Sequence, residues 1–312
     1  MPVRPLVRSV VSPLVRGVTT RGRRGLEPAA QLAAIFTGGA KGAWYERGNL
    51  ASLYQESTGA TPVATAANPV GFGLSRDQGG GRGPELVTNG SFSAGLTGWT
   101  AIDTAPAVTS VVGGTAQMSA VGAGAIARIR QPVTITPGSW YEVSYDISGD
   151  VSTTTLFGVG NSAGGTEYFS RAGVTGPQHG FFFAAGAVAH VSLYKGANNG
   201  VALVDNISLK EIKGNHQQQA TPGFRPTYQI GPKRLVFDGV DDVLNTTFAS
   251  ALGTNCTVGR AVPGTGAVIA AGVNIGTSFA DNATAAALVI VDRALTAGET
   301  AALTAYLNQQ LA

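Results

Sequence analysis

Alternation of apolar and polar residues is the feature that most constrains the fold of this chain. In residues 140–147 (Trp-Tyr-Glu-Val-Ser-Tyr-Asp-Ile), Tyr141, Val143, Tyr145 and Ile147 fall on one face and polar residues fill most of the other. Comparable short runs occupy residues 130–137, 188–194 and 203–209. A period of two residues, broken by Gly, Asn and Pro, indicates half-buried β-strands. Residues 85–212 are therefore predicted to form one antiparallel β-sandwich.

Composition supports an all-β chain. Of the 312 residues, 44 are glycine and only 12% are charged, which suits turn-rich β-structure and argues against a solvated disordered chain. The single cysteine, Cys256, excludes an internal disulfide and a multi-cysteine zinc site. No apolar run reaches the length of about 18 residues that a membrane-spanning helix needs.

Two strings mark the ends of this sandwich and carry a resemblance. Residues 85–99 include Asn-Gly-Ser-Phe and end on Gly-Trp, and residues 201–212 include Val-Asp-Asn-Ile. Together they resemble the ends of a carbohydrate-binding-module-like jelly roll, the galactose-binding-like sandwich of polysaccharide enzymes and of phage tail and capsid proteins. The resemblance implies a glycan-binding role for residues 85–212.

The flanking segments resemble a second module. Residues 42–57 begin Gly-Ala-Trp-Tyr, residues 225–228 read Arg-Pro-Thr-Tyr and residues 237–242 read Phe-Asp-Gly-Val-Asp-Asp. These strings resemble a laminin-G/concanavalin-like module, another sandwich that phage structural proteins use. We expect residues 41–80 and 213–312 to form one reduced, discontinuous domain with the jelly roll inserted at a Gly-rich turn. Three consecutive domains are the alternative.

Short helices are expected near residues 27–36 and 297–311. The first has Leu32, Ile35 and Phe36 on one face, and residues 26–40 form a helix and linker. The second follows a capping box, Thr296 with Glu299, and has an apolar face. The fold class is thus all-β, with two jelly-roll-type sandwiches, two short helices and an extended N-terminal arm.

Residues 1–25 are predicted to be that arm. They hold six arginines and no acid, whereas the rest of the chain has more acidic than basic residues. A basic arm without interleaved aromatic rings favours a protein partner over nucleic acid. A disordered tail is the alternative. Partner contacts are expected from Arg4, Leu6, Arg8, Leu14, Arg16, Arg21, Arg23 and Arg24.

Candidate sites are few, and no residue is expected to be catalytic. Sugars bind aromatic faces together with amide and guanidinium groups, so the expected glycan-binding residues are Tyr168, Arg171, Gln178, His179, Tyr194, Asn198 and Asn199. The jelly-roll resemblance implies a structural Ca²⁺ between an acidic residue near the first strand and an aspartate in the last, here Glu85 and Asp205. The string of residues 238–242, with three aspartates, fits a hydrogen-bonded turn or a Ca²⁺ loop.

The expected function is that of a non-enzymatic structural protein of a phage virion. The arm would join it to other virion proteins, copies would form a homotrimer as closed symmetry favours, and the sandwiches would contact host surface polysaccharide. A free-standing polysaccharide-binding protein and a glycan-processing enzyme are the other two hypotheses. The expected location is the virion, assembled in the host cytoplasm, without a membrane span.

Overall fold

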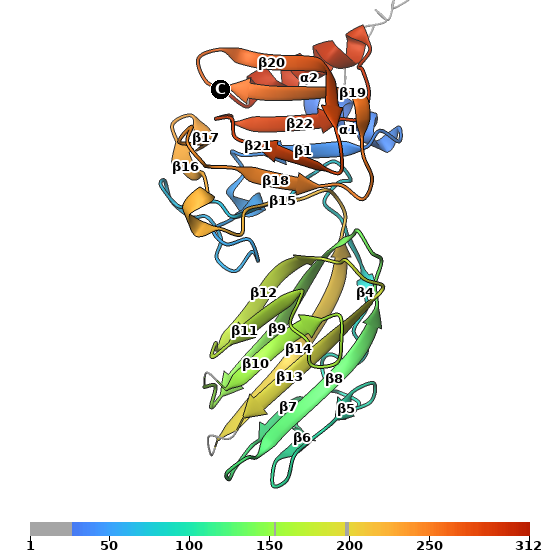
Figure 1. Cartoon of the computed structure of the whole chain (residues 1–312), viewed down its shortest axis with the longest axis vertical. Coiled ribbons are helices and arrows are strands. Elements are labelled where there is room, and N and C mark those ends of the chain that lie inside the picture. The colour runs from blue at the N-terminus through green and yellow to red at the C-terminus, as the bar shows by residue number, and fades with distance from the viewer. Residues whose placement is uncertain (1–26, 153, 197–199) are drawn as a thin grey trace, which may run out of the picture.

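The computed structural model describes residues 27–152, 154–196 and 200–312 (Figure 1). The predicted arm, and with it all eight of its expected contact residues, lies outside the described residues, as do Asn198 and Asn199. The described chain is built almost entirely from antiparallel β-sheets. The prediction of an all-β sandwich fold is confirmed.

The inserted sandwich consists of two facing sheets. The first, called the groove sheet here, has the strand order β11 (Phe169–Ala172), β10 (Thr155–Gly160), β13 (Val188–Gly196), β8 (Ile126–Thr134) and β5 (Thr100–Ala101). The second, called the junction sheet, has the order β12 (Gly176–Phe183), β9 (Trp140–Gly149), β14 (Val201–Ile212), β7 (Thr115–Ser119) and β6 (Val108–Val112), and β4 (Arg82–Glu85) also pairs with β14.

Alternating side chains from both sheets form the core of this sandwich. On β9, the predicted inner residues Tyr141, Val143, Tyr145 and Ile147 are all buried in one cluster with Ile129 and Val191 from the facing sheet and with Leu209 from neighbouring strand β14. The predicted alternation is therefore correct. Trp99 lies in the same cluster, and its indole N–H donates to the carbonyl of Asn89 at 3.2 Å, which fixes the start of the sandwich.

The remaining elements form a base of two main sheets (Figure 1). One has the order β1 (Gly42–Glu46), β22 (Ala287–Val291), β19 (Gly253–Val262) and β20 (Gly266–Ile275). The other has the order β2 (Leu53–Tyr54), β3 (Phe72–Gly73), β15 (Gln217–Gln218), β18 (Leu244–Thr247) and β21 (Ser278–Asp281). A hairpin of β16 (Thr227–Ile230) and β17 (Lys233–Val236) and two 3-10 turns, Leu50–Ser52 and Pro222–Phe224, complete it.

Helices cover one face of the base, so it differs from a plain two-sheet sandwich. All five residues of β22, Ala-Leu-Val-Ile-Val, are buried. Both faces of such a strand need an apolar cover. Helices α1 (Pro28–Thr37) and α2 (Ala297–Gln309) supply it on one side, through residues that include Leu32, Phe36 and Leu303. Both helices begin and end within two residues of the positions predicted from the sequence. The Thr296–Glu299 capping box is present at the start of α2.

Segments from before and after the inserted sandwich pair with one another in the base. Strand β1 pairs with β22, and β3 pairs with β15. A buried polar cluster joins the same two segments: the Asp77 carboxylate accepts hydrogen bonds from the Ser75 hydroxyl at 2.6 Å and the Asn215 amide at 3.1 Å. The chain enters and leaves the sandwich at one place, where the Lys213 N–H donates to the Gly81 carbonyl at 2.9 Å.

An aromatic cluster connects the sandwich to the base. Trp140 and Phe181, from the outer face of the junction sheet, pack against Phe72 of the base. Trp140 is only 2% exposed although it lies on the face of β9 opposite the sandwich core. His216 completes the cluster with its ring edge toward Phe72 and Trp140. This face of the junction sheet is therefore covered by protein, whereas the groove sheet has its outer face free of the base (Figure 1).

Candidate functional site

The groove sheet carries a small groove on its outer face. Its volume is about 140 Å³, and its lining consists of Arg128, Leu156, Gly158, residues 163–166, Ser192 and Tyr194. We call it the Tyr194 groove. Three strands position it through direct cross-strand pairs, because Tyr194 on β13 lies opposite Arg128 on β8 and Leu156 on β10. Side chains that are opposite one another in neighbouring strands point to the same face.

Glycines allow a loop to close one end of this groove. Residues 161–168, which join β10 to β11, fold back over the sheet, and the Gly164 N–H donates to the Ser192 hydroxyl at 3.3 Å. A Cβ on Gly158 would lie 2.9 Å from the Thr166 methyl, and one on Gly160 would lie 2.3 Å from the Gly165 carbonyl carbon. Any larger residue at these two positions would push the loop off the sheet.

An aromatic ring and a cation form the floor of the groove. The Arg128 guanidinium carbon lies 5.3 Å from the centre of the Tyr194 ring, a distance typical of a cation–π contact. His190 lies on the same face of β13 as Ser192 and Tyr194. Its Nδ1 is buried without a hydrogen-bond partner among the described residues. The groove thus offers one ring, one guanidinium and one hydroxyl within three neighbouring strands.

The other described glycan-site candidates do not join Tyr194. The Tyr168 ring stacks on Phe182 with centroids 5.3 Å apart and its hydroxyl accepts from the Gly186 N–H at 2.9 Å, so it supports the sandwich core. Arg171 donates to the Gln178 side-chain oxygen at 2.9 Å. These two residues bridge β11 and β12 at the edge where the two sheets meet.

His179 lies at the junction with the base instead. Its ring packs 5.5 Å from the Tyr54 ring and 6.0 Å from the Phe181 ring. Burial lowers the pKa of His179, and the nearby Arg171 charge acts in the same direction. The candidates therefore fall into three separate places, and only Tyr194 faces the groove.

The two residues of the expected calcium site are engaged with protein groups. The Glu85 carboxylate accepts from the Leu209 N–H at 2.8 Å, from the Val87 N–H at 3.0 Å and from the Ser208 hydroxyl at 2.5 Å. Asp205 accepts from the Asn206 N–H at 2.7 Å. Glu85 therefore fastens β4 to β14, and neither residue belongs to a cluster of three or more metal-binding side chains in the part of the chain that the structure describes.

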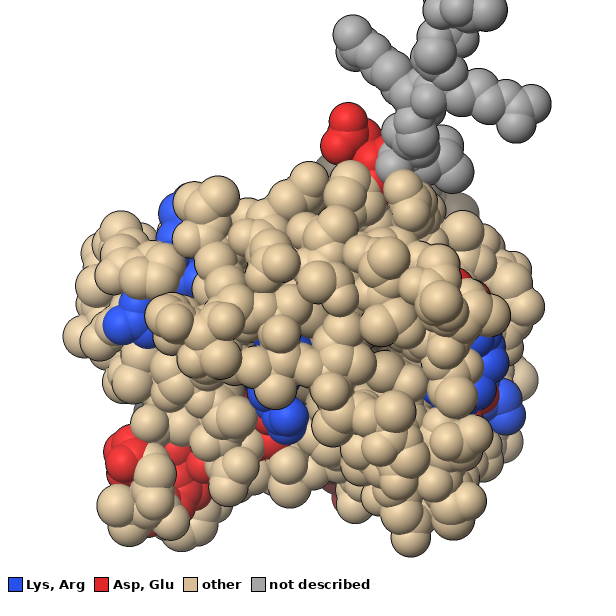
Figure 2. All heavy atoms as spheres, turned by 90° about the horizontal axis from the view of Figure 1, so that it is seen from above, with Lys and Arg blue, Asp and Glu red and all other residues tan. Residues whose placement is uncertain are grey.

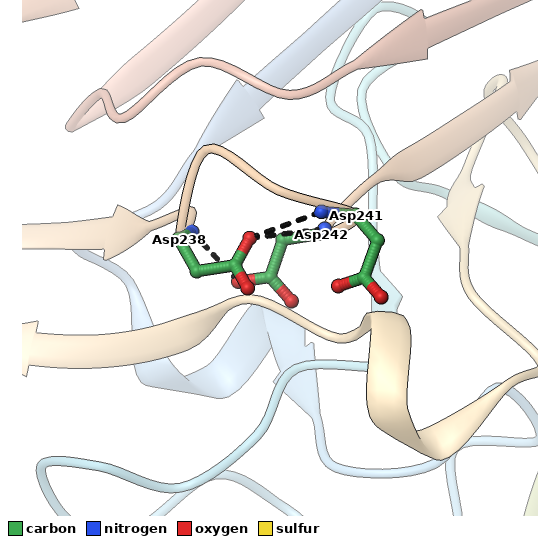
Figure 3. Close-up of side chains that lie close together, drawn as sticks. All are labelled: Asp238, Asp241 and Asp242. Atoms are coloured by element: carbon green, nitrogen blue, oxygen red, sulfur yellow. Dashed lines mark hydrogen bonds between the residues drawn. The ribbon is translucent and has the colours of Figure 1, made fainter.

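Among the described residues, one acidic cluster is present, in the loop between β17 and β18 (Figure 3). The carboxylates of Asp238, Asp241 and Asp242 lie within 4.8 Å of one another. One Asp238 oxygen accepts from the N–H groups of Val240 at 2.9 Å and of Asp241 and Asp242 at 3.2 Å. These backbone hydrogen bonds lower the pKa of Asp238. The geometry is that of a turn held by its own aspartate, the first of the two structures that the sequence allowed.

Residues 160–164 read Gly-Asn-Ser-Ala-Gly, which matches the Gly-x-Ser-x-Gly spacing of serine hydrolases. In that class the serine lies on a turn between a strand and a helix, with a histidine as its base. Here Ser162 lies in the hairpin loop between β10 and β11, where its carbonyl accepts from the Gly165 N–H at 2.9 Å, and none of the hydrogen bonds of the described residues joins it to a histidine. The match therefore has the spacing of the motif without its structural context.

Arg128, Leu156 and Ser192 are groove residues that the sequence did not single out. Arg128 lies on the outer face of β8, whose burial alternates strictly, so its face could be predicted, whereas β10 and β13 are buried at most positions and do not alternate in this way. Their proximity to Tyr194 depends on the register between β8, β13 and β10, for which the sequence offers no signal.

Comparison with known proteins gives similar structures only. No family model and no curated protein matches the chain. A solved structure described as "CBM4 structure and function" is 16% identical over 40% of this chain and 99% of its own, with a TM-score of 0.33. The xylan-binding module CBM86 from Roseburia intestinalis is 12% identical over 37% of this chain and 96% of its own, with a TM-score of 0.26.

A third similar structure is the enzymatically active domain of tailspike protein 4 from bacteriophage CBA120. It is 16% identical over 41% of this chain, with a TM-score of 0.34, and the match spans 21% of the tailspike chain. Among the described residues, no helix is both long and apolar enough to cross a bilayer.

Proposed function

We propose that this chain is a non-catalytic glycan-binding protein and that the Tyr194 groove receives the sugar. One observation carries the proposal: the groove combines an aromatic ring, a guanidinium and a hydroxyl on the outer face of the groove sheet. An apolar ring face with a few well-placed hydrogen-bonding groups is the usual composition of a small-molecule site. No Asp or Glu is among the described residues that line the groove, whereas hydrolysis of a glycoside requires two facing carboxylates.

Different lining residues would contact the apolar and the polar parts of a sugar. Tyr194 and Leu156 offer apolar surface to the C–H groups of a pyranose ring. The Arg128 guanidinium and the Ser192 hydroxyl offer hydrogen bonds to ring hydroxyls. A volume of about 140 Å³ accommodates roughly one sugar unit, and the loop of residues 161–168 limits the groove on one side.

The test is glycan binding by the full chain and by two variants at Tyr194. Tyr194→Ala removes the ring and is expected to weaken binding about tenfold or more, because a buried tyrosine at the centre of an interface contributes at least ~1–2 kcal/mol. Tyr194→Phe keeps the ring and should bind within about threefold of the original chain. Phe224→Ala, an exposed ring on the base, is the control. Equal binding by the Tyr194→Ala variant would refute the site.

We infer further that the chain is displayed on a bacteriophage particle and attached through residues 1–25. The concentration of six arginines in this segment, with no acid, supports an anchoring role.

The end of the base formed by α2 and β20 supports contacts with neighbouring copies, since it is mostly uncharged (Figure 2). Edge strand β20 contains no charged residue over Gly266–Ile275 and exposes Val268. A homotrimer would satisfy such contacts in a closed ring.

Deletion of residues 1–25 tests the anchor. The shortened chain should still bind glycan but fail to join the particle in an assembly assay. If it joins at the original level, the anchor is elsewhere. If the full chain never associates with a particle, a free-standing polysaccharide-binding protein is the better description.

Light scattering tests whether the chain forms the proposed homotrimer, and a monomer at micromolar concentration would refute it. Release of reducing sugar from the bound polysaccharide would favour the enzyme hypothesis.

A further inference from the structure

Two arginines on the groove sheet differ from all others in the described chain. Arg128 and Arg130 are two residues apart on β8, so both point to the outer face, opposite Tyr194 and Ser192 respectively. No described carboxylate pairs with either guanidinium. The other described arginines all donate from their guanidinium groups to protein acceptors: Arg47, Arg76, Arg82, Arg171, Arg225, Arg234, Arg260 and Arg293.

Two carboxylates lie near the groove, and both bind other groups. Asp103 accepts from the Thr109 N–H at 2.7 Å and the Thr109 hydroxyl at 2.8 Å, and also from the backbone N–H of Arg128 at 2.9 Å. Glu167 accepts from the Asn161 N–H at 3.1 Å inside the loop that closes the groove. The protein therefore uses its nearby acids to hold backbone and leaves the two guanidinium groups facing outward.

Two unpaired cations on adjacent positions of one face create a local positive potential. Residues i and i+2 of a strand are roughly 6.5 Å apart, which is close enough for both guanidinium groups to reach one anionic group or its neighbours. Guanidinium–carboxylate hydrogen bonds are about twice as strong as neutral ones. A neutral sugar would leave this potential uncompensated, whereas an anionic sugar would neutralise it.

We propose, on the basis of the glycan-binding function above, that the Tyr194 groove selects anionic glycans. The sugar ring lies against Tyr194 and Leu156, and its carboxylate or sulfate is held by Arg128 and Arg130. The ligand class is thus a polysaccharide with uronic acid or sulfated units.

The experiment measures the affinity of the full chain for two matched pairs of polymers. Polygalacturonate is compared with its fully methyl-esterified form, and dextran sulfate with dextran. Within at least one pair, the anionic polymer should bind tenfold or more tightly than the neutral one, and this difference should shrink as NaCl rises from 0.05 to about 0.5 M. The two pairs separate carboxylate from sulfate recognition.

Variants assign the effect to the groove, because residues 1–25 also carry arginines that attract polyanions. Arg128→Gln and Arg130→Gln should each weaken binding of the preferred anionic polymer about fivefold to tenfold. Arg234→Gln, which removes the same charge from the base, should bind as the original chain does. Thermal melting of each variant checks that the fold is kept.

The outcomes separate the two proposals. Equal affinity for neutral and anionic polymers would overturn the anionic selectivity and leave glycan binding in place. Anionic binding that Arg128→Gln and Arg130→Gln do not reduce would overturn the assignment to the groove. Absence of binding to all four polymers would overturn the anionic selectivity, and the wider glycan-binding proposal would then depend on a panel of neutral glycans.

Discussion

Replacement of His216 should remove much of the acid sensitivity of this protein. The ring is 1% exposed in the aromatic cluster between the sandwich and the base. Its Nδ1 accepts a hydrogen bond from the Ser75 N–H at 2.9 Å, so the neutral ring carries its proton on Nε2. Burial lowers the pKa of His216 to about 3, and the carbonyl of Ile212 opposes the shift only in part.

The direction and the size of the change in stability with pH follow from the lowered pKa of His216. The unfolded chain binds the proton near pH 6.5 and the folded chain only near pH 3, so acid favours the unfolded state between these values. The contribution of His216 to stability is complete above pH 6.5 and is lost as the pH falls toward 3. At pH 4 the loss amounts to about 3 kcal/mol relative to pH 7.5.

Urea denaturation at pH 7.5 and pH 4, followed by tryptophan fluorescence, measures this loss. His216→Asn keeps an acceptor for the Ser75 N–H but does not titrate in this range. The variant should be less stable at pH 7.5 and should lose about 3 kcal/mol less than the original chain on going to pH 4. Phe72→Leu loosens the same cluster without removing a titratable group, so it should retain the original pH dependence. Equal losses in the original chain and the His216→Asn variant would refute the reasoning.

Three further changes have expected magnitudes that thermal or urea denaturation can check. Asp281→Asn should cost about 3–5 kcal/mol, because two arginines hold this buried carboxylate and would be left as unpaired cations; a loss below 1 kcal/mol would contradict this. Gly90→Ala would place a Cβ 1.8 Å from the Ile207 carbonyl oxygen and should cost at least about 1–3 kcal/mol, whereas Gly81→Ala, with open space around it, should cost less. Thr296→Ala should cost about 1 kcal/mol by removing the cap of α2, and an unchanged melting temperature would show that the cap is dispensable.

Local patterns in the sequence predicted individual elements well. The alternation in residues 140–147 places Tyr141 and Tyr145 in the sandwich core, and the capping box at Thr296 marks the start of α2. These features depend on neighbours in the sequence, so periodicity and capping rules detect them. The continuous apolar run in β22 likewise signals burial on both faces, although it does not specify that helices cover one of them.

The candidate site was harder to predict because it depends on contacts between distant strands. Tyr194 was selected for its aromatic ring, but its neighbour Arg128 is 66 positions earlier and is brought close by pairing of β13 with β8. Tyr168 and His179 also carry rings that could contact a sugar, as Tyr194 does. The structure directs the first toward the core and the second toward the base. Residue type therefore identified the candidates, whereas the fold was needed to show which of them lies in the groove.

The hydrogen bond between Lys213 and Gly81 brings together the two points at which the polypeptide passes between the base and the inserted sandwich. A different domain with neighbouring ends could replace residues 82–212 without rerouting any strand of the base. Such a replacement would also need an apolar patch of its own to shield Phe72, which the native insert covers with Trp140 and Phe181. Recombination at this single entry point would exchange the inserted sandwich, and with it the Tyr194 groove, while the strands of the base stay the same.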